Sequence, residues 1–388
     1  MKPSARIAGI NADGSDGWGV MYQARDLKRA GLPVLDLTIG DHDWATPAPL
    51  IDAMAQSARD GDTGYAPIAG LPPLRDAIAE RVARQTGVPT SPENVMVVPG
   101  GQGGLFSSMM AVLDPGDRAL LLDPYYATYP GTIRAASGVP EVVFTRAEAG
   151  FEPLAADLDA APAAKALLIN TPNNPSGAVY SPATMEGLAA FAQARDLWVI
   201  SDEVYGGQVW QGEHLSPRAL PGMAERTLVV GSLSKSHVMT GWRLGWIIGP
   251  EEMIAHICDL ATNTTYGVPG FIQSAALAAL SDTTGIEAAT VETYRSRRAG
   301  ILDTLSGQNA VGAAPASGGM YVMLDIRATG LSGDSFAQGL LDTHRVAVMP
   351  GESFGAACAG HLRVALTRPV EDLTEAIGRI VKYAEDLK

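Results

Sequence analysis

The sequence predicts an α/β fold, in which helices sandwich a mainly parallel seven-stranded sheet and a smaller α+β domain follows. Between residues 94 and 248, short apolar and β-branched runs alternate with segments of helical periodicity. Polar and aromatic residues stand at the ends of several of these runs, where a parallel sheet places its ligands. After about residue 285 the helices and strands become fewer and interleaved, which is typical of a separate, smaller unit.

The large sheet is expected from seven apolar runs. Helices are expected between them, and the segment 181–196 has a clear start signal, with Ser181 as N-cap and Pro182 in the first helical position. Because parallel sheets are covered on both faces, such strands read as nearly continuous apolar runs. The expected strands are 95–98, 119–124, 142–145, 165–170, 197–203, 228–230 and 246–248.

Three segments make up the predicted domain organisation. Residues 1–47 form an arm, with a short helix near 20–31 and a strand within 34–40 that joins the small domain. Residues 48–285 form the large domain, and residues 286–388 form the small C-terminal α+β domain. The small domain is expected to contain a long helix over 291–305, strands at 321–326 and 362–367, and a final amphipathic helix with Leu373, Ile377, Ile380 and Ala384 on one face.

Composition narrows the class of protein. The chain has 388 residues, 46% of them hydrophobic, and a net charge of −14 from 28 basic and 42 acidic residues. This charge disfavours nucleic acid and anionic membranes as partners, and no apolar run is long enough for a membrane span. The N-terminus lacks a secretory pattern, so we expect a cytoplasmic protein. The cysteines, Cys258 and Cys358, lie far apart and predict neither a disulfide framework nor a metal site.

The stretch 228–247 holds a lysine, Lys235, between two apolar runs, with hydroxyl side chains beside it. Burial between strands disfavours the charged ammonium, which lowers the lysine pKa and lets the amine act as a nucleophile. Ser232 and Ser234 can donate hydroxyl hydrogen bonds to a phosphate, and Arg243 can donate a bidentate pair. A surface turn with a solvated lysine is the alternative interpretation of this peptide alone.

Other candidate residues follow the neighbouring strands. The glycine-rich stretch 99–104 opens a helix, whose free N–H groups suit a phosphate. Tyr126 could stack on a planar ring, Asn174 could hydrogen-bond a ring hydroxyl, and Asp202 ends a strongly apolar strand. Taken singly, each has an ordinary interpretation as a turn, a packing aromatic or a capping aspartate.

One cofactor, pyridoxal 5′-phosphate (PLP), accounts for all of these strand ends. PLP needs a lysine for its Schiff base, an anion beside its pyridine nitrogen, a donor to its 3′-oxygen, an aromatic stacking partner and a phosphate cup. The candidates for these roles, in that order, are Lys235, Asp202, Tyr205 with Asn174, Tyr126, and the turn Gly101, Gln102 and Gly103 with Ser232, Ser234 and Arg243.

Seven short motifs carry a family resemblance. They are G-D-x-D-W-x-T-P at 40–47, Y-x-P-x-x-G-L-x-x-L-R at 65–75, N-N-P-S-G at 173–177, S-D-E-V-Y at 201–205, S-L-S-K-S-x-x-M-T-G-W-R-L-G-W at 232–246, P-G-x-x-F-G at 350–355 and L-R-V-A-L at 362–366. With these motifs the sequence resembles the class I/II aminotransferases of the fold-type I PLP enzymes over nearly its whole length. Within that family it looks most like the branch of arginine–pyruvate transaminases and aspartate aminotransferase-like enzymes.

The resemblance implies an enzyme that moves an amino group from an L-amino acid to a 2-oxo acid, pyruvate or 2-oxoglutarate. Lys235 would form the aldimine with PLP and act as the base, and a pyridoxamine phosphate intermediate would carry the amino group. Arg363 would bind the substrate carboxylate with help from Gly40 and Asn174. The resemblance also implies a homodimer in which Tyr65 reaches the partner's phosphate.

Two alternatives stay open at this point. A PLP-dependent carbon–sulfur lyase acting by β-elimination would use the same cofactor residues. A PLP-binding regulator would need a DNA-binding module, for which the first 30 residues are too few. The chain also departs from the family pattern at His42, where proline is usual, and at Gln102, where many relatives carry a larger or charged residue; both departures concern the substrate side of the site.

Overall fold

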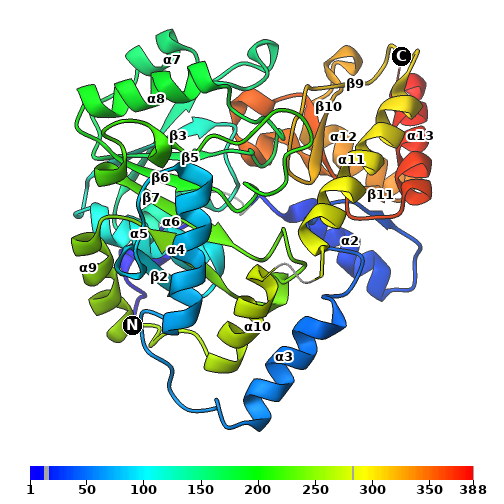
Figure 1. The fold of residues 1–388 in the computed structure, drawn as a ribbon. Helices are drawn as coiled ribbons and strands as arrows, with labels where there is room; N and C mark the ends of the chain where they lie inside the picture. Colours follow the sequence, from blue (N-terminus) through cyan, green and yellow to red (C-terminus); the bar gives the residue numbers. More distant parts are fainter. Residues whose placement is uncertain (13–16, 282–283, 388) are drawn as a thin grey trace.

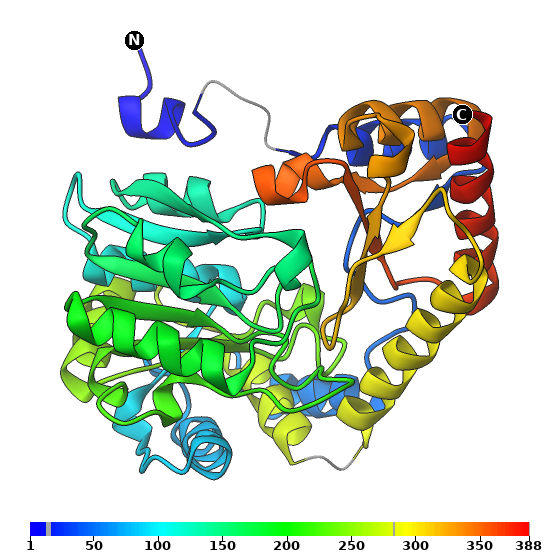
Figure 2. The ribbon, with the colours of Figure 1, turned by 90° about the horizontal axis from the view of Figure 1, so that it is seen from above.

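The computed structural model describes residues 1–12, 17–281 and 284–387. Two lobes are visible, a larger one built on a twisted sheet and a smaller one that contains the C-terminus (Figures 1 and 2). Residues 13–16 of the predicted arm and residues 282–283, at the end of the predicted large domain, lie outside the described part of the chain.

The large lobe contains the predicted mainly parallel seven-stranded sheet. Its strand order is β2-β8-β7-β6-β5-β3-β4, and only β8 runs antiparallel to its neighbours. The strands β2, β5, β7 and β8 are buried at every position, which explains their unbroken apolar sequences. The bounds are Val95–Val98 for β2, Arg118–Asp123 for β3, Val139–Phe144 for β4, Ala166–Asn170 for β5, Trp198–Asp202 for β6, Thr227–Ser232 for β7 and Gly245–Ile248 for β8.

Helices cover both faces of this sheet. One face packs on α5, α6 and α9, because alternate strand residues such as Met96 and Val98 point to that side. The other face packs on α4 and α10 at one end and on α7 and α8 at the other, while α3 packs on α10. The bounds are Ala48–Arg59 for α3, Pro72–Thr86 for α4, Gly100–Val112 for α5, Tyr129–Ala135 for α6, Ala155–Asp159 for α7, Pro182–Ala194 for α8, Glu251–Thr262 for α9 and Gly270–Leu280 for α10.

Two helix starts bear on the sequence predictions. The Ser181 side chain accepts a hydrogen bond from the Thr184 N–H at 3.2 Å, so the predicted cap of α8 is confirmed. The stretch 99–104 was expected as a turn before a helix. Instead α5 begins at Gly100, and the glycines occupy its first turn because their small size lets this helix end approach the sheet closely.

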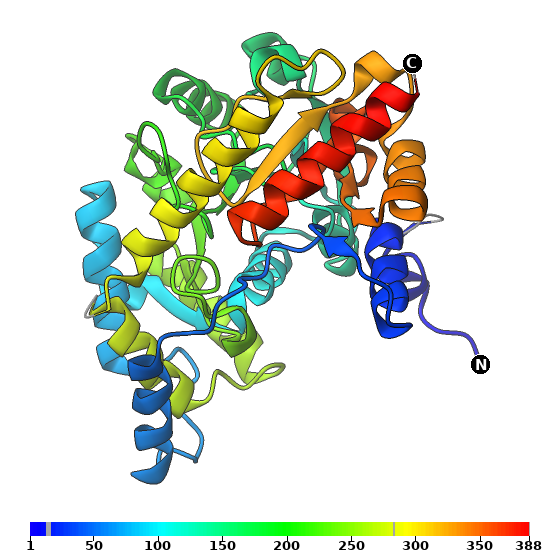
Figure 3. The ribbon, with the colours of Figure 1, turned by 90° about the vertical axis from the view of Figure 1, so that its right-hand side faces the viewer.

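The small lobe combines a four-stranded antiparallel sheet, in the order β12-β13-β10-β9, with three helices. Figure 3 shows α11 and α13 packed against it, and these two helices contact each other. The bounds are Ile286–Leu305 for α11, Gly312–Ala313 for β9, Tyr321–Asp325 for β10, Gly333–His344 for α12, Met349–Pro350 for β12, His361–Ala365 for β13 and Val370–Asp386 for α13.

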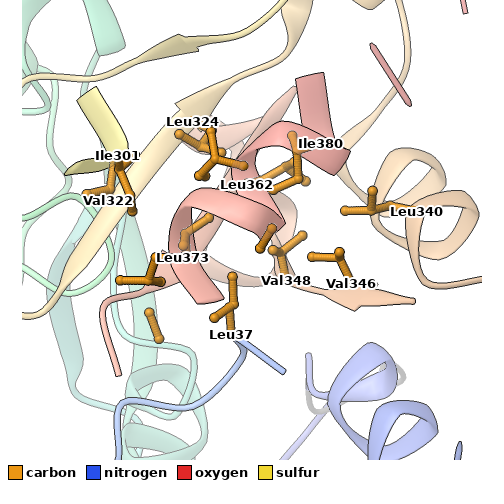
Figure 4. Close-up of a cluster of buried hydrophobic side chains, with 14 of the residues drawn as sticks. Leu37, Ile301, Val322, Leu324, Leu340, Val346, Val348, Leu362, Leu373 and Ile380 are labelled. Atoms are coloured by element: carbon orange, nitrogen blue, oxygen red, sulfur yellow. The ribbon is translucent and has the colours of Figure 1, made fainter. Parts of the chain in front are cut away.

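The N-terminal segment pairs with a strand of the small lobe. The strand β1 (Leu35–Asp36) is shorter than the predicted 34–40, and it pairs in parallel with β11 (Val346–Ala347). Leu37 follows β1 and lies inside the small-lobe core, together with leucine, isoleucine and valine side chains of α11, α12, α13 and the sheet (Figure 4). Burial of these side chains stabilises the lobe by roughly 1.5–3 kcal/mol for each large one.

Two short helices lie in the described part of the first 30 residues. Helix α2 (Gly19–Arg29) packs on α12 of the small lobe. The single turn α1 (Ala5–Ala8) instead lies beside α6 of the large lobe, where Arg134 donates to the Ile10 carbonyl at 3.1 Å (Figure 2). The arm therefore contacts both lobes. Within the described ranges, none of the helices has the length and apolar character needed to span a bilayer.

Candidate active site

A cavity of about 220 Å³ lies at the carboxyl ends of β5, β6 and β7, between the two lobes. Most of the predicted site residues line it. Its lining consists of Trp18, Ile39, Gly40, Gly101, Gln102, Leu105, Tyr126, Tyr129, Asn170, Asn174, Asp202, Val204, Tyr205, Ser232, Ser234, Lys235, Thr240, Arg243, Tyr321 and Arg363.

Lys235 reaches this cavity from the loop after β7. Its Nζ donates to the Gly40 carbonyl at 2.5 Å, and its own carbonyl accepts from the Gln208 amide at 2.9 Å. Burial lowers the pKa of the Lys235 amine, while Tyr321 and Asp41 oppose that shift. A larger share of neutral amine is the result, and the neutral amine is the form that attacks a carbonyl carbon.

Asp202 ends β6 as a buried carboxylate. Tyr129 donates its hydroxyl to Oδ2 at 2.6 Å, and the Val204 N–H donates to Oδ1 at 3.2 Å. Burial raises the pKa of Asp202 to about 6 despite these donors. Among the described residues no lysine, arginine or histidine forms an ion pair with this carboxylate, so it is available to a cationic ligand atom.

Arg363 stands on β13 and is 1% exposed. Its Nη1 donates to Asn174 Oδ1 at 2.9 Å and its Nη2 to the Thr38 carbonyl at 2.5 Å. The rings of Tyr321 and Phe354 each lie 4.3 Å from the guanidinium carbon. Within the described ranges no carboxylate pairs with Arg363, and its Nε makes no hydrogen bond, so the site offers a fixed, unneutralised cation.

A cradle for an anion forms where β7, β8 and the start of α5 meet. Ser232 and Ser234 are buried, with their hydroxyl oxygens 2.8 Å apart. Arg243 lines the same cavity in the left-handed region at φ 53°, and a Cβ on Gly100 would lie 2.4 Å from its Nη2. The free N–H groups of the 13-residue helix α5 face this point, which favours a phosphate.

Three tyrosines and one amide complete the wall. The hydroxyls of Tyr205 and Tyr321 are 3.4 Å apart, and burial raises the pKa of Tyr205 well above its usual value. Tyr126 lies edge-on to Tyr129, with ring centroids 5.7 Å apart, and lines the cavity. The Asn174 N–H donates to Asn170 Oδ1 at 2.8 Å, which fixes the loop that carries the Asn174 amide.

The cavity does not gather every predicted residue. Gly103 lines a neighbouring cavity of about 1220 Å³ instead. Tyr65 lies outside both cavities, is 90% exposed and stacks edge-on against Tyr266 at 5.0 Å. Gln102 does line the site, but its amide hydrogen-bonds Thr132 and Thr128 at 2.7 and 3.1 Å, which holds it to α6.

Several lining residues were not among the predicted site residues. Tyr129 hydrogen-bonds Asp202, Tyr321 stacks on Arg363, and Trp18 lies 5.8 Å from the Arg363 guanidinium. Only Tyr129 had a sequence signal, since it closes the aromatic cluster after β3. Trp18 and Tyr321 come from the other lobe, and no local pattern indicates that the lobes meet there.

These groups fit PLP. A buried carboxylate without a cation suits a protonated pyridine nitrogen, the serine–arginine cradle suits a phosphate, and the buried lysine, whose amine has a lowered pKa, suits an aldehyde. The unneutralised arginine beside them suits the carboxylate of an amino acid. Fold and site together therefore define a PLP-dependent enzyme of fold type I.

Comparisons with known proteins identify the family. Residues 33–380 match the family model described as "Aminotransferase class I and II". The chain is 43% identical to the arginine–pyruvate transaminase of Pseudomonas aeruginosa, with 98% of this chain and 97% of the relative covered. It is 37% identical to the aspartate/prephenate aminotransferase of Thermus thermophilus, with 98% and 96% covered.

Solved structures agree. A mutant aspartate aminotransferase of Thermus thermophilus superposes with a TM-score of 0.92 at 35% identity, over 99% of this chain and 100% of that one. The aspartate aminotransferase of Thermotoga maritima gives 0.92 at 31% identity, over 99% and 100%. The chain belongs to the class I and II aminotransferases, and it is a PLP-dependent aminotransferase. These findings give no support to the carbon–sulfur lyase alternative.

Proposed function

We propose that this aminotransferase takes the amino group of an L-amino acid with a long or basic side chain and passes it to pyruvate or 2-oxoglutarate. The observation that carries the proposal is the larger cavity of about 1220 Å³, which adjoins the site through the shared lining residues Trp18 and Gln102. A side chain that passes these two residues has room to extend. The relative named for arginine and pyruvate shares 43% identity over 98% of this chain, which supports a donor of this kind.

The charge of the larger cavity also supports a basic donor. Asp334 and Glu352 line it, and Glu352 Oε2 is buried without a hydrogen-bond partner in the described part of the chain. Arg134 is a cation in the same lining, and one of its N–H groups donates a hydrogen bond to the Ile10 carbonyl. With two carboxylates and one arginine, the lining of the cavity carries a net negative charge, which favours a guanidinium or ammonium group.

We assign the cofactor roles as follows. Asp202 holds the pyridine nitrogen in its protonated form, Tyr205 and Asn174 bind the 3′-oxygen, and Tyr126 stacks on the ring. PLP supplies an electron sink for the carbanion that forms when the substrate loses its α-proton. The phosphate is bound by Ser232, Ser234, Arg243 and the N–H groups of Gly101, Gln102 and Gly103.

Lys235 and Arg363 would perform the substrate chemistry. Arg363, with Asn174 and Gly40 beside it, binds the α-carboxylate and thereby orients the Cα–H bond. Lys235 would hold the cofactor through its amine and, as a neutral base, would take the α-proton of the substrate. The same amine would then hold that proton and deliver it in the second half of the transfer. The lowered pKa of the Lys235 amine supports this role.

A donor panel tests the substrate assignment. Purified protein with PLP would be supplied with arginine, lysine, methionine, aspartate and alanine, each with pyruvate or 2-oxoglutarate, and the 2-oxo acid product quantified. We expect kcat/KM to be about ten-fold or more higher for arginine than for alanine. A preference for aspartate would overturn the basic-donor proposal. Ammonia and pyruvate formed from cysteine or cystathionine without an added 2-oxo acid would instead indicate a lyase.

We also propose a homodimer in which Tyr65 completes the partner's phosphate site. Its support is the exposure of Tyr65 and Tyr266, 90% and 52%, since large aromatic side chains gather at interfaces. Mixing Tyr65→Ala and Lys235→Ala proteins would then create hybrid dimers with one intact site. Recovery of about a quarter of wild-type activity is expected from an isologous dimer, and no recovery would contradict it.

We propose that the protein lies in the cytoplasm. We also propose three units in the chain: residues 1–47, which join the small domain, residues 48–285, and residues 286–388. Two free cysteines, Cys258 and Cys358, support a reducing compartment. The pairing of β1 with β11 supports the assignment of the first unit to the small domain. Cell fractionation would test the location, and limited proteolysis between the units would test the division.

A further inference from the structure

The segment 40–44 passes directly beside the amine of Lys235. The Gly40 carbonyl accepts the Lys235 hydrogen bond at 2.5 Å, and among the described residues Nζ forms no other hydrogen bond. A Cβ on Gly40 would lie 2.0 Å from the Tyr321 hydroxyl, so the backbone already touches its neighbour. Any displacement of this segment therefore moves the acceptor that holds the amine.

His42 ties this segment to helix α11. Its Nδ1 lies 2.7 Å from the hydroxyl of Tyr294, a fully buried residue on α11. The ring also packs edge-on against Trp44, with centroids 4.9 Å apart. His42 Nε2 is enclosed by the protein and makes no hydrogen bond of normal geometry with any described residue, although it faces the backbone of Ser234.

The ring is neutral at physiological pH. Burial, followed by the nearby Lys235 charge, lowers the pKa of His42 to about 4, while Ser234, Asp41 and Asp43 act in the opposite direction. A neutral imidazole adds no positive charge next to the amine. It can therefore hold the segment in place without opposing a proton on Lys235.

Helix α11 contacts two segments that lie next to Lys235. Arg297 forms a two-pronged ion pair with Asp43, with both N–O distances 2.8 Å. One and two turns earlier on the helix, Tyr294 contacts His42 and Thr290 donates to the Ser236 carbonyl at 3.3 Å. These α11 residues recur at helical spacing and thus lie on one face of the helix. This face therefore contacts both the 40–44 segment, which accepts the hydrogen bond of the lysine amine, and Ser236, the residue after Lys235.

We propose that His42 is a positioning residue: its hydrogen bond to Tyr294 anchors the 40–44 segment to α11 and so keeps the Gly40 carbonyl on the Lys235 amine. The inference deepens the proposed function and rests on Lys235 as the base. It also gives a reason for the departure from the usual proline, because proline has no side-chain group that could bond Tyr294. His42 acts through Gly40 and does not itself touch the substrate.

Three variants of the holoenzyme test the proposal. Tyr294→Phe removes only the hydroxyl, and His42→Leu removes the ring nitrogens. His42→Asn retains a polar group at the position of Nδ1. We expect the first two to lower kcat about ten-fold with KM changed less than about two-fold, because a displaced base slows proton transfer without weakening substrate binding. His42→Asn should recover most of kcat.

Coupling and a matched control make the test specific. The double variant His42→Leu/Tyr294→Phe should be no slower than either single variant, since both remove the same bond. Tyr383→Phe is the control: Tyr383 packs on Phe336 in the small-lobe core, and its loss should leave kcat unchanged. Additive losses, or unchanged kcat in both single variants, would overturn the proposal.

A second readout avoids turnover altogether. The rate at which apoprotein takes up PLP depends on the neutral fraction of Lys235, so its pH profile reports the pKa of that amine. A carbonyl acceptor stabilises the ammonium form; hence His42→Leu and Tyr294→Phe should move the midpoint to lower pH, by about half a unit or more. The titratable groups that face the His42 ring are Lys235, Asp41, Asp43 and the Tyr294 hydroxyl.

The outcomes separate two failures. If the variants lose only thermal stability, with kcat and the uptake midpoint unchanged, His42 is a packing residue and the inference is wrong. If Lys235→Ala retains transamination, the proposed role of the lysine fails. The uptake profile of the His42 variants would then still decide whether His42 positions that amine.

Discussion

At the scale of one residue, Asp202 is a functional candidate that lowers the folding stability of the protein. Its carboxylate is 4% exposed, and it accepts two hydrogen bonds yet has no cationic partner among the described residues. A charge buried in this way costs free energy in the protein without cofactor. In the role proposed above, a protonated ring nitrogen beside Asp202 would offset this cost. The proposed ligand, and not the fold, then accounts for the residue.

The first prediction concerns the stability of the apoprotein. The folded-state pKa of Asp202 is about 6 and lies above the ordinary value of 3.8, so the folded state holds its proton more tightly. The penalty is present above about pH 6 and disappears below about pH 4. Asp202→Asn should therefore stabilise the apoprotein by about 1–3 kcal/mol at about pH 8, with little effect at about pH 4.

Denaturant unfolding at the two pH values checks this. The variant should also bind PLP more weakly and lose about 100-fold or more in kcat, because an amide does not keep the ring nitrogen protonated. A variant less stable than the wild type at high pH would contradict the interpretation of Asp202 as an unpaired charge.

Arg363 is the second residue-scale case. Its guanidinium carbon lies 4.3 Å from the ring centroids of both Tyr321 and Phe354, and a planar guanidinium packs on aromatic rings better than an ammonium group does. Arg363→Lys should raise KM for both amino acid and 2-oxo acid and lower kcat/KM about 100-fold, the equivalent of losing charge-assisted hydrogen bonds. Steady-state kinetics with each substrate checks this, and the absorbance of bound PLP, which should persist, is the control. Equal loss of PLP would place Arg363 in the cofactor site.

At the scale of an element, the first turn of helix α5 consists mainly of glycines, which have no side chain. Gly100 adopts φ +72°, and its neighbour Gly101 lies close enough to Val204 that a Cβ would be 2.8 Å away. Glycine is the residue that tolerates both the backbone angle and the close approach. The helix end can thus lie against β7 and β8, with its N–H groups directed at the phosphate cradle.

Gly100→Ala tests that close approach. The new Cβ would lie 2.4 Å from Arg243 Nη2, so the arginine must move, and the dissociation constant of PLP should rise about ten-fold or more. Equilibrium titration of PLP fluorescence measures this. Gly187→Ala is the matched control, since nothing lies within 4 Å of a Cβ there in the middle of α8. It should stabilise the protein by about 0.5–1 kcal/mol and leave PLP affinity unchanged.

On the scale of the whole molecule, buried polar contacts join segments far apart in the chain, and one of them is the contact between His42 and Tyr294. The folded-state pKa of His42 is about 4 and lies below the ordinary 6.5, so the unfolded chain takes up a proton first as the pH falls. Stability from the neutral ring is complete above about pH 6.5 and is lost as the pH falls towards about 4. Asp123 and Asp202, both with pKa values raised to about 6, act in the opposite direction.

Comparison of wild type with His42→Asn isolates the histidine from these carboxyl groups. Relative to wild type, the variant should gain about 2 kcal/mol between about pH 8 and about pH 5, because asparagine does not titrate. Unfolding free energies measured at both pH values provide the test. A difference that does not change with pH would show that His42 is not held neutral in the folded protein.

Local patterns were sufficient for much of the architecture. The seven apolar runs predicted the sheet because parallel strands are buried on both faces, and Ser181 with Pro182 predicted the start of α8 through local hydrogen bonding. The strand within 34–40 was overestimated: β1 has only two residues, since β11 offers a short partner. Strand length depends on the neighbouring strand, which lies about 300 residues away.

The sequence by itself determined the fold class, the cofactor and the residues at the strand ends, because strand direction collects these residues at one edge. Only the tertiary structure decided what holds them in place. Tyr129 on Asp202, Tyr321 on Arg363 and His42 on Tyr294 all join segments far apart in the chain. Such contacts depend on which distant segments the fold brings together and leave no periodic signal. The sequence names the lysine, and the packing of distant segments explains how its amine is held.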